Sequence, residues 1–173
     1  MIFYNLFLYL LFPIAILRLF SKKEFNVAQI KRIKERLGLK KHLNCEEPIW
    51  IHAVSVGEVK VAVLLVKELK KIFSDSNFLV TTSTVTGSNE VTKSFGSEVA
   101  HQYLPYDLNG VIKKFLINLN PKCLILVETE VWPNLISNCK KAEIPLILLN
   151  GRMSKKSLLS LIHISEPTRP LYI

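Results

Sequence analysis

The chain has 173 residues, a length that fits one domain with at most a short appendage. Of these residues 49% are hydrophobic, yet 23 Lys and Arg outnumber 14 Asp and Glu and give a formal net charge of +9. This combination is unusual for an ordinary soluble domain, whereas contact with an anionic membrane surface would account for both properties. Cys45, Cys123 and Cys139 form no CxxC or Cys/His pair, so they predict reduced structural thiols in the cytoplasm and no zinc or iron–sulfur site.

Residues 1–20 consist almost entirely of Leu, Ile, Phe and Tyr, and as a helix they would reach roughly 30 Å, about one hydrocarbon core. Arg18, Lys22 and Lys23 follow this run, while only the terminal amine is positive before it. The positive-inside rule then keeps the rest of the chain in the cytoplasm. We therefore expect a single membrane anchor of the signal-anchor type over residues 1–22.

The same residues allow two alternatives to a spanning anchor. A cleaved signal peptide is disfavoured because the charges lie on the wrong side and no small-x-small cleavage site follows. A helix lying in the membrane interface, kinked at Pro13, remains open because Asn5 and Arg18 shorten the apolar stretch.

Residues 23–48 are expected to hold a basic juxtamembrane helix and a polar linker. Residues 29–41 have the spacing of an amphipathic helix that ends at Gly38. Its basic side chains are Lys31, Arg32, Lys34, Arg36, Lys40 and Lys41. They fit either a solvated helix face or a helix attracted to anionic headgroups, at about 1 kcal/mol per charge.

From residue 49 to about 161, short apolar runs alternate with helical stretches, which is typical of a parallel sheet with crossover helices. Strands are expected at residues 49–54, 78–82, 101–104, 122–127 and 145–149, and helices at about 58–73, 88–95, 107–119 and 133–141, with Asp107 capping the third. The fold class is therefore α/β, a Rossmann-like parallel-sheet domain preceded by the anchor helix.

In such a sheet, ligands bind outside the carboxyl ends of the strands, and the loops expected there are unusually polar. In the first loop, Gly57 would allow a tight turn, and free N–H groups with the Ser55 hydroxyl would form a seat for a phosphate or carboxylate. This loop matches neither GxGxxG nor a Walker motif.

Glu58 and Glu128 are the candidate acids. Glu58 stands in the first turn of a helix, where a carboxylate also complements the helix dipole by about 0.3–1 kcal/mol without any catalytic role. As a general base it would need partial burial or a neighbouring acid. Glu128 ends a buried strand, should be held by specific hydrogen bonds and could be that neighbour, whereas Glu130 could simply cap the helix near Pro133.

The histidines show no ligand spacing, and His52, alternating with Trp50, is expected to make a buried hydrogen bond. We predict no metal, no cofactor and no nucleic-acid partner.

Five short motifs stand in the order and spacing of the 3-deoxy-D-manno-octulosonic acid (Kdo) transferases: WIHAVSVGEV, TTSTVTGS, YLPYDL, ETEVWPNLI and LNGRMS. The chain to about residue 161 therefore resembles the amino-terminal half of these enzymes. The resemblance implies an inverting, metal-independent glycosyltransferase of the GT-B type at the cytoplasmic face of the inner membrane. It would transfer Kdo from CMP-Kdo to lipid A precursor (lipid IVA) in lipopolysaccharide biosynthesis.

The resemblance also implies roles for individual residues. Glu58 would be the general base and Glu128 would stabilise the transition state. Residues that match positions around the acceptor pocket are Ser55, Gly57, Thr84, Thr86, Gly87 and Arg152.

Two departures from the family pattern are visible. NGRMS stands where relatives usually have NARLS, which could loosen the loop before Arg152. Residues 162–173 contain HISEPTRPLYI, which has no helical periodicity and no visible match, so we interpret them as a truncation artefact that replaces the donor domain. Alternatives to an enzyme fragment are a non-catalytic, membrane-tethered lipid A-binding module and another GT-B transferase.

Overall fold

The computed structural model describes residues 2–20, 27–39, 45–128 and 131–149, and the side chains of all of these except residues 2, 15–20 and 27–31. Five parallel strands form one sheet, β1 (Ile49–His52), β2 (Phe78–Thr82), β3 (Ala100–Tyr103), β4 (Cys123–Val127) and β5 (Leu146–Leu149). Their order is β3-β2-β1-β4-β5. The chain thus runs outward from the central β1 in one direction and then returns to build the other half, as in Rossmann folds.

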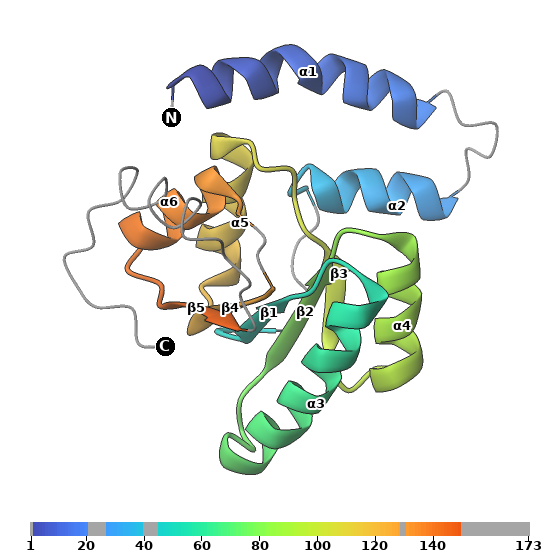
Figure 1. The fold of residues 1–173 in the computed structure, drawn as a ribbon, viewed down its shortest axis with the longest axis vertical. Coiled ribbons are helices and arrows are strands. Elements are labelled where there is room, and N and C mark those ends of the chain that lie inside the picture. Colours follow the sequence, from blue (N-terminus) through green and yellow to red (C-terminus); the bar gives the residue numbers. More distant parts are fainter. Residues whose placement is uncertain (1, 21–26, 40–44, 129–130, 150–173) are drawn as a thin grey trace.

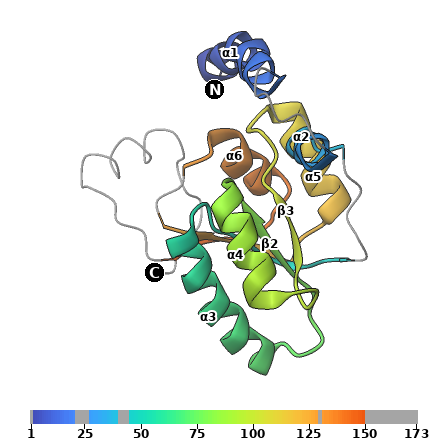
Figure 2. The ribbon, with the colours of Figure 1, turned by 90° about the vertical axis from the view of Figure 1, so that its right-hand side faces the viewer.

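Helices cover both faces of the sheet. Helices α3 (Val56–Ile72) and α4 (Val85–Phe95) lie on one face, and α5 (Asn109–Leu119) and α6 (Pro133–Lys141) lie on the other (Figures 1 and 2). This three-layer arrangement confirms the predicted α/β Rossmann-like domain.

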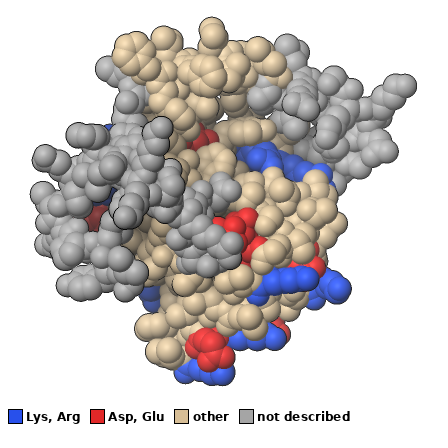
Figure 3. Space-filling view, viewed as in Figure 1, with Lys and Arg blue, Asp and Glu red and all other residues tan. Residues whose placement is uncertain are grey.

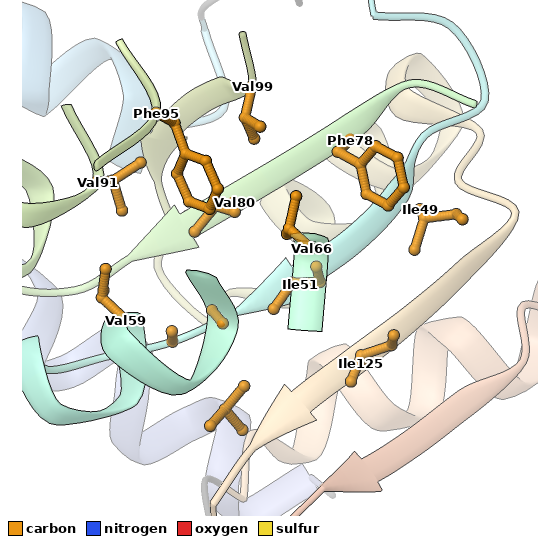
Figure 4. Close-up of a cluster of buried hydrophobic side chains, with 13 residues drawn as sticks. Ile49, Ile51, Val59, Val66, Phe78, Val80, Val91, Phe95, Val99 and Ile125 are labelled. Carbon is orange, nitrogen blue, oxygen red and sulfur yellow. The ribbon is translucent and has the colours of Figure 1, made fainter. Parts of the chain in front are cut away.

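The alternation of side chains along each strand assigns the core residues to two clusters. Ile49, Ile51, Phe78 and Val80 point to α3 and α4, where they meet Val66 and other aliphatic side chains (Figure 4). Trp50, Leu79, Leu124 and Leu126 point to the other face and pack against α5 and α6. Because both faces are covered, β1, β2 and β4 are buried along almost their whole length, and the polar residues of β1 and β2, His52, Thr81 and Thr82, stand at their carboxyl ends.

Two further helices precede the sheet, α1 (Ile2–Phe20) and α2 (Val27–Arg36), and they lie beside each other at one end of the molecule (Figures 1 and 2). Helix α2 ends as expected, since Gly38 adopts the left-handed conformation, φ 64°, that glycine tolerates best. Among the described residues, none of the helices is both long enough and apolar enough to cross a membrane, so the predicted spanning anchor is not supported there.

Candidate functional site

The loops that follow β1 and β4 flank the point at which the strand order reverses. β1 pairs with β2 on one side and with β4 on the other, so the chain turns in opposite directions after β1 and after β4. Ligands of open α/β sheets bind in the crevice at such a switch point. The sequence placed Glu58 after β1 and Glu128 after β4, and the topology brings these two loops to the same place.

Glu58 is held by its own loop. It is 6% exposed, and Ser55 and Glu58 form a capping box at the start of α3. The carboxylate accepts hydrogen bonds from the Val54 N–H at 2.7 Å, the Ser55 N–H at 3.2 Å and the Ser55 hydroxyl at 2.8 Å. The Ser-x-x-Glu spacing explains this geometry, because the side chain at the third helical position reaches back to the cap.

This capping box corrects the predicted anion seat. Two of the donors expected to hold an external phosphate or carboxylate, the Ser55 N–H and the Ser55 hydroxyl, bind Glu58 instead. Gly57 does not adopt a left-handed conformation, and a Cβ there would meet only the Ser55 Oγ, at 3.9 Å, so the turn into α3 does not require glycine at this position. The first loop therefore presents a buried carboxylate, not a cradle for an anion.

The second loop is joined to the first through the backbone of Val54. Thr84 caps α4 by accepting from the Gly87 N–H at 3.1 Å, and its hydroxyl donates to the Val54 carbonyl at 2.8 Å. Gly87 is required for this approach, since a Cβ there would lie 2.9 Å from the Thr84 Oγ1 and 3.1 Å from the Val54 oxygen. Thr86 is exposed beside this junction. The Val54 N–H thus binds Glu58 and the Val54 carbonyl binds Thr84, so Val54 connects the first loop to the second.

Glu128 directly follows β4. Its side chain is exposed, and among the described residues no hydrogen bond to it from a neighbouring side chain is recorded, nor one between it and Glu58. Its backbone has φ 64°, and its N–H donates to the Leu149 carbonyl at 2.8 Å. Few non-glycine residues adopt this conformation, which is enriched at functional sites. Arg152 and Glu130 lie outside the described residues.

Beneath the two loops, His52 makes the buried hydrogen bonds that the sequence predicted. Its Nδ1 lies 2.9 Å from the Thr81 hydroxyl, which also accepts from the Trp50 indole N–H at 2.8 Å. Burial lowers the pKa of His52 to about 4, against a smaller opposing effect of the Thr81 carbonyl. The His52 ring packs edge-on against Trp132, and within the described residues His52 Nε2 and Trp132 Nε1 are buried without a hydrogen-bond partner.

Asp107 caps α6 and not α5, the helix that the sequence predicted. Helix α5 begins with Leu108 as its N-cap and has no side-chain cap, whereas Asp107 accepts from the backbone N–H groups of Asn134 at 3.0 Å and Leu135 at 2.8 Å. It therefore caps α6, the helix that follows the Glu128 loop. Burial raises the pKa of Asp107, against the opposing effect of these hydrogen bonds and of one from Tyr4. No local pattern reveals this role, because Asp107 and its partners are distant in the sequence.

Helix α2 contacts the loop that follows β2. The Arg36 guanidinium donates to the Ser83 carbonyl at 2.6 Å and lies over the rings of Tyr103 and Tyr106. Glu35, which is buried, accepts from the Tyr103 N–H at 2.9 Å. The end of α2 is thus fixed to the loop that leads to Thr84, a contact that the sequence analysis missed.

No group of three or more His, Cys, Asp and Glu side chains within the described ranges could hold a metal ion. The three cysteines are free, as expected, and burial raises their pKa values, that of Cys139 to about 12. These thiols are therefore protonated, and those of Cys45 and Cys139 lie in the protein interior, whereas Cys123 is half-buried.

A parallel α/β domain with polar loops at its switch point is a class with many activities, and comparison with known proteins identifies the family. The family model described as 3-deoxy-D-manno-octulosonic-acid transferase (kdotransferase) matches residues 31–172. The chain therefore belongs to the Kdo transferase family. The match extends beyond residue 161 and so includes most of the segment in which the sequence analysis saw no resemblance.

The chain is similar to three proteins named as Kdo transferases. It is 42% identical to one from Haemophilus influenzae over 129 residues, which cover 73% of this chain and 30% of that protein. It is 37% identical to one from Rickettsia bellii over 150 residues, which cover 86% of this chain and 36% of that protein. It is 35% identical to a probable mitochondrial one from Arabidopsis thaliana over 149 residues, which cover 84% of this chain and 33% of that protein. The chain thus spans about a third of the length of these relatives.

Proposed function

We propose that this chain is the acceptor-binding half of a GT-B Kdo transferase, which transfers Kdo from CMP-Kdo to lipid IVA in lipopolysaccharide biosynthesis. The donor CMP-Kdo would be bound by a second domain. The observation that carries the proposal is the junction at the switch point, in which the buried Glu58 is joined through Val54 to Thr84 and Gly87. In a family of sugar transferases, a fixed carboxylate at this place is suited to accept a proton from an acceptor hydroxyl.

The hydrogen bonds of Glu58 indicate which atom would act. Oε1 accepts from both the N–H and the hydroxyl of Ser55, whereas Oε2 accepts from the Val54 N–H. A carboxylate oxygen has two lone pairs, so Oε2 retains one for an incoming hydroxyl. In the proposed step the hydroxyl proton passes to Oε2, the hydroxyl oxygen bonds to the anomeric carbon of Kdo, and the bond from that carbon to CMP breaks with inversion.

Other residues would support this step without a metal or cofactor. Glu128, exposed at the neighbouring loop, would stabilise the transition state as the family resemblance implies. Acceptor contacts are assigned to Ser55, Gly57, Thr84, Thr86, Gly87 and Arg152. Preorganised groups of this kind lower the barrier because they need not reorganise as charge develops.

We further place the chain at the cytoplasmic face of the inner membrane, where its lipid acceptor would be found. Helix α1 exposes Phe3, Leu6 and Leu10, and Lys and Arg side chains gather beside it over α2 (Figure 3). An exposed apolar strip next to basic residues is the pattern by which amphipathic helices bind anionic membranes.

A chimaera tests the proposed activity. Residues 1–149 would be joined to the remaining part of the Haemophilus influenzae relative, and CMP release would be measured with CMP-Kdo and lipid IVA. We expect release that requires both substrates, and none from the present chain alone, because donor and acceptor must be held together for reaction. A folded chimaera that binds lipid IVA but releases no CMP would contradict the proposal.

The capping box favours one second candidate, a membrane-tethered lipid A-binding module without catalysis. Glu58 already has a complete structural role there, so its presence does not require chemistry. Binding of lipid IVA by the chain, combined with an inactive chimaera, would favour this module. Transfer to a different acceptor would instead favour another GT-B activity.

A further inference from the structure

One side of α1 is fastened to the folded domain by contacts with residues distant in the sequence. The Tyr4 hydroxyl donates to Asp107 Oδ2 at 2.8 Å, and the Asn134 side-chain amide donates to Asn5 Oδ1 at 2.7 Å. Two turns further along, the Phe12 ring packs edge-on against Tyr106, with ring centroids 5.9 Å apart. These contacts are spread over residues 4–12, so they hold this part of the helix lengthwise against the domain.

Asp107 is the centre of this attachment, and it is 4% exposed. Besides the Tyr4 hydroxyl, it binds the first N–H groups of α6 at Asn134 and Leu135. A buried carboxylate is costly unless it is fully hydrogen-bonded, and here donors from two elements share that role. We refer to Tyr4, Asn5, Asp107 and Asn134 as the polar latch.

The outward side of α1 is apolar and exposed. Phe3, Phe7, Leu10 and Ile14 follow the spacing of one helix face, and their exposed fractions are 86%, 59%, 72% and 61%. Exposed apolar strips of this size on one element mark a surface that contacts a partner.

We propose that α1 lies in the plane of an anionic lipid surface, held flat against the domain by the polar latch, with Phe3, Phe7, Leu10 and Ile14 among the acyl chains. This inference rests on the membrane association proposed above and specifies its geometry.

Two observations support a lipid surface and this orientation. The net charge of +9 and the basic side chains beside α1 complement anionic headgroups (Figure 3). A helix crossing the bilayer would withdraw Tyr4 and Asn5 from Asp107 and Asn134 and place their polar groups in hydrocarbon without partners.

The geometry can be measured by depth-dependent fluorescence quenching of the full chain on vesicles of phosphatidylcholine and phosphatidylglycerol. Phe3→Trp and Ile14→Trp variants would be compared, with the unsubstituted chain giving the background of Trp50 and Trp132. Lipids brominated at different acyl positions report the depth of each new indole. In a spanning helix, positions 3 and 14 would differ in depth by roughly 16 Å, at about 1.5 Å per residue.

We expect both indoles at the same shallow depth, within a few ångströms, and at least tenfold weaker binding to vesicles of phosphatidylcholine alone. A depth difference near the spanning value would overturn the in-plane geometry and leave membrane association standing. Absence of binding to either vesicle would overturn both. Equal binding to the two vesicles would overturn the anionic partner.

The polar latch is tested by a matched pair of variants in the same helix. Tyr4→Phe removes one hydroxyl from the latch, and Tyr9→Phe removes the same group from a side chain that is 54% exposed. Amide hydrogen exchange of α1 should become about tenfold faster in Tyr4→Phe, as for loss of a hydrogen bond to a carboxylate, and stay unchanged in Tyr9→Phe. Equal exchange in the two variants would refute the latch.

Discussion

Replacing Glu58 by Gln separates the structural role of this side chain from its proposed chemical role. The amide is nearly the same size as the carboxylate, and glutamine also occurs at this position of capping boxes. The amide oxygen can accept from the Val54 N–H, while the amide NH2 can donate to the Ser55 hydroxyl. Only the longer bond from the Ser55 N–H, 3.2 Å, is left without an acceptor.

The expected effects therefore differ greatly in size. Loss of one long hydrogen bond and of the carboxylate charge at the start of α3 should lower the free energy of unfolding by about 1–2 kcal/mol. An amide cannot accept the proton, so turnover should fall by roughly 10² to 10⁴, which corresponds to about 3–5 kcal/mol of barrier. Binding of lipid IVA should change little, because the lost interaction belongs to the chemical step.

Steady-state kinetics of the chimaera, together with urea unfolding of the present chain, measure the two effects. Glu68→Gln is the matched control, because Glu68 lies on the same helix, is exposed and pairs only with Lys71 at the surface. It should leave both quantities within experimental error. Near-normal turnover of a folded Glu58→Gln chimaera would show that Glu58 only caps α3.

Three further predictions concern stability and topology. Because burial lowers the pKa of His52 to about 4 from 6.5, the unfolded state binds its proton first as the pH falls, and stability should drop by about 2 kcal/mol between pH 7 and pH 5. Urea unfolding should show a flatter pH dependence for His52→Gln, and an unchanged slope would assign the effect to other groups. Gly87→Ala should lose about 1–3 kcal/mol by crowding the Val54 carbonyl, whereas Gly110→Ala, with open space around it, should gain about 0.5–1 kcal/mol; similar unfolding midpoints would contradict the close approach. Protease added outside spheroplasts should leave the folded domain intact, and its digestion would place the domain in the periplasm.

The elements of this fold could be predicted because their signals are local. Alternating apolar runs and helical spacing located each strand and crossover helix of the sheet to within about three residues. The strand order could not be derived in the same way, because β1 gives no local indication that β4 will lie beside it. The sequence could suggest that the Glu58 and Glu128 loops are neighbours at the carboxyl ends of the strands, whereas the switch point between β1 and β4 becomes visible only in the structure.

The site shows the same limit for individual residues. Ser55 and Glu58 are three positions apart, so their capping box follows a known spacing. The sequence-based interpretation of Glu58 nevertheless included only its interaction with the helix dipole. Gly57 and Gly87 look equivalent in the sequence, yet only Gly87 meets another backbone closely. Asp107 precedes one helix and caps another, because the N–H groups of Asn134 and Leu135 compete successfully for its carboxylate.

The placement of α1 and α2 bears on how a lipid acceptor would reach Glu58. Arg36 fixes α2 to the loop after β2, and Tyr4 and Asn5 fix α1 to the segments after β3 and β4, so both helices contact residues that follow the carboxyl ends of the strands. If the apolar face of α1 lies among acyl chains, an acceptor whose acyl chains share that layer would extend its sugar headgroup across the Ser83–Thr84 loop toward Glu58. Shortening the acyl chains of the acceptor should then weaken binding to the chain, whereas Glu58→Gln should not, and the two measurements would separate lipid capture from proton transfer.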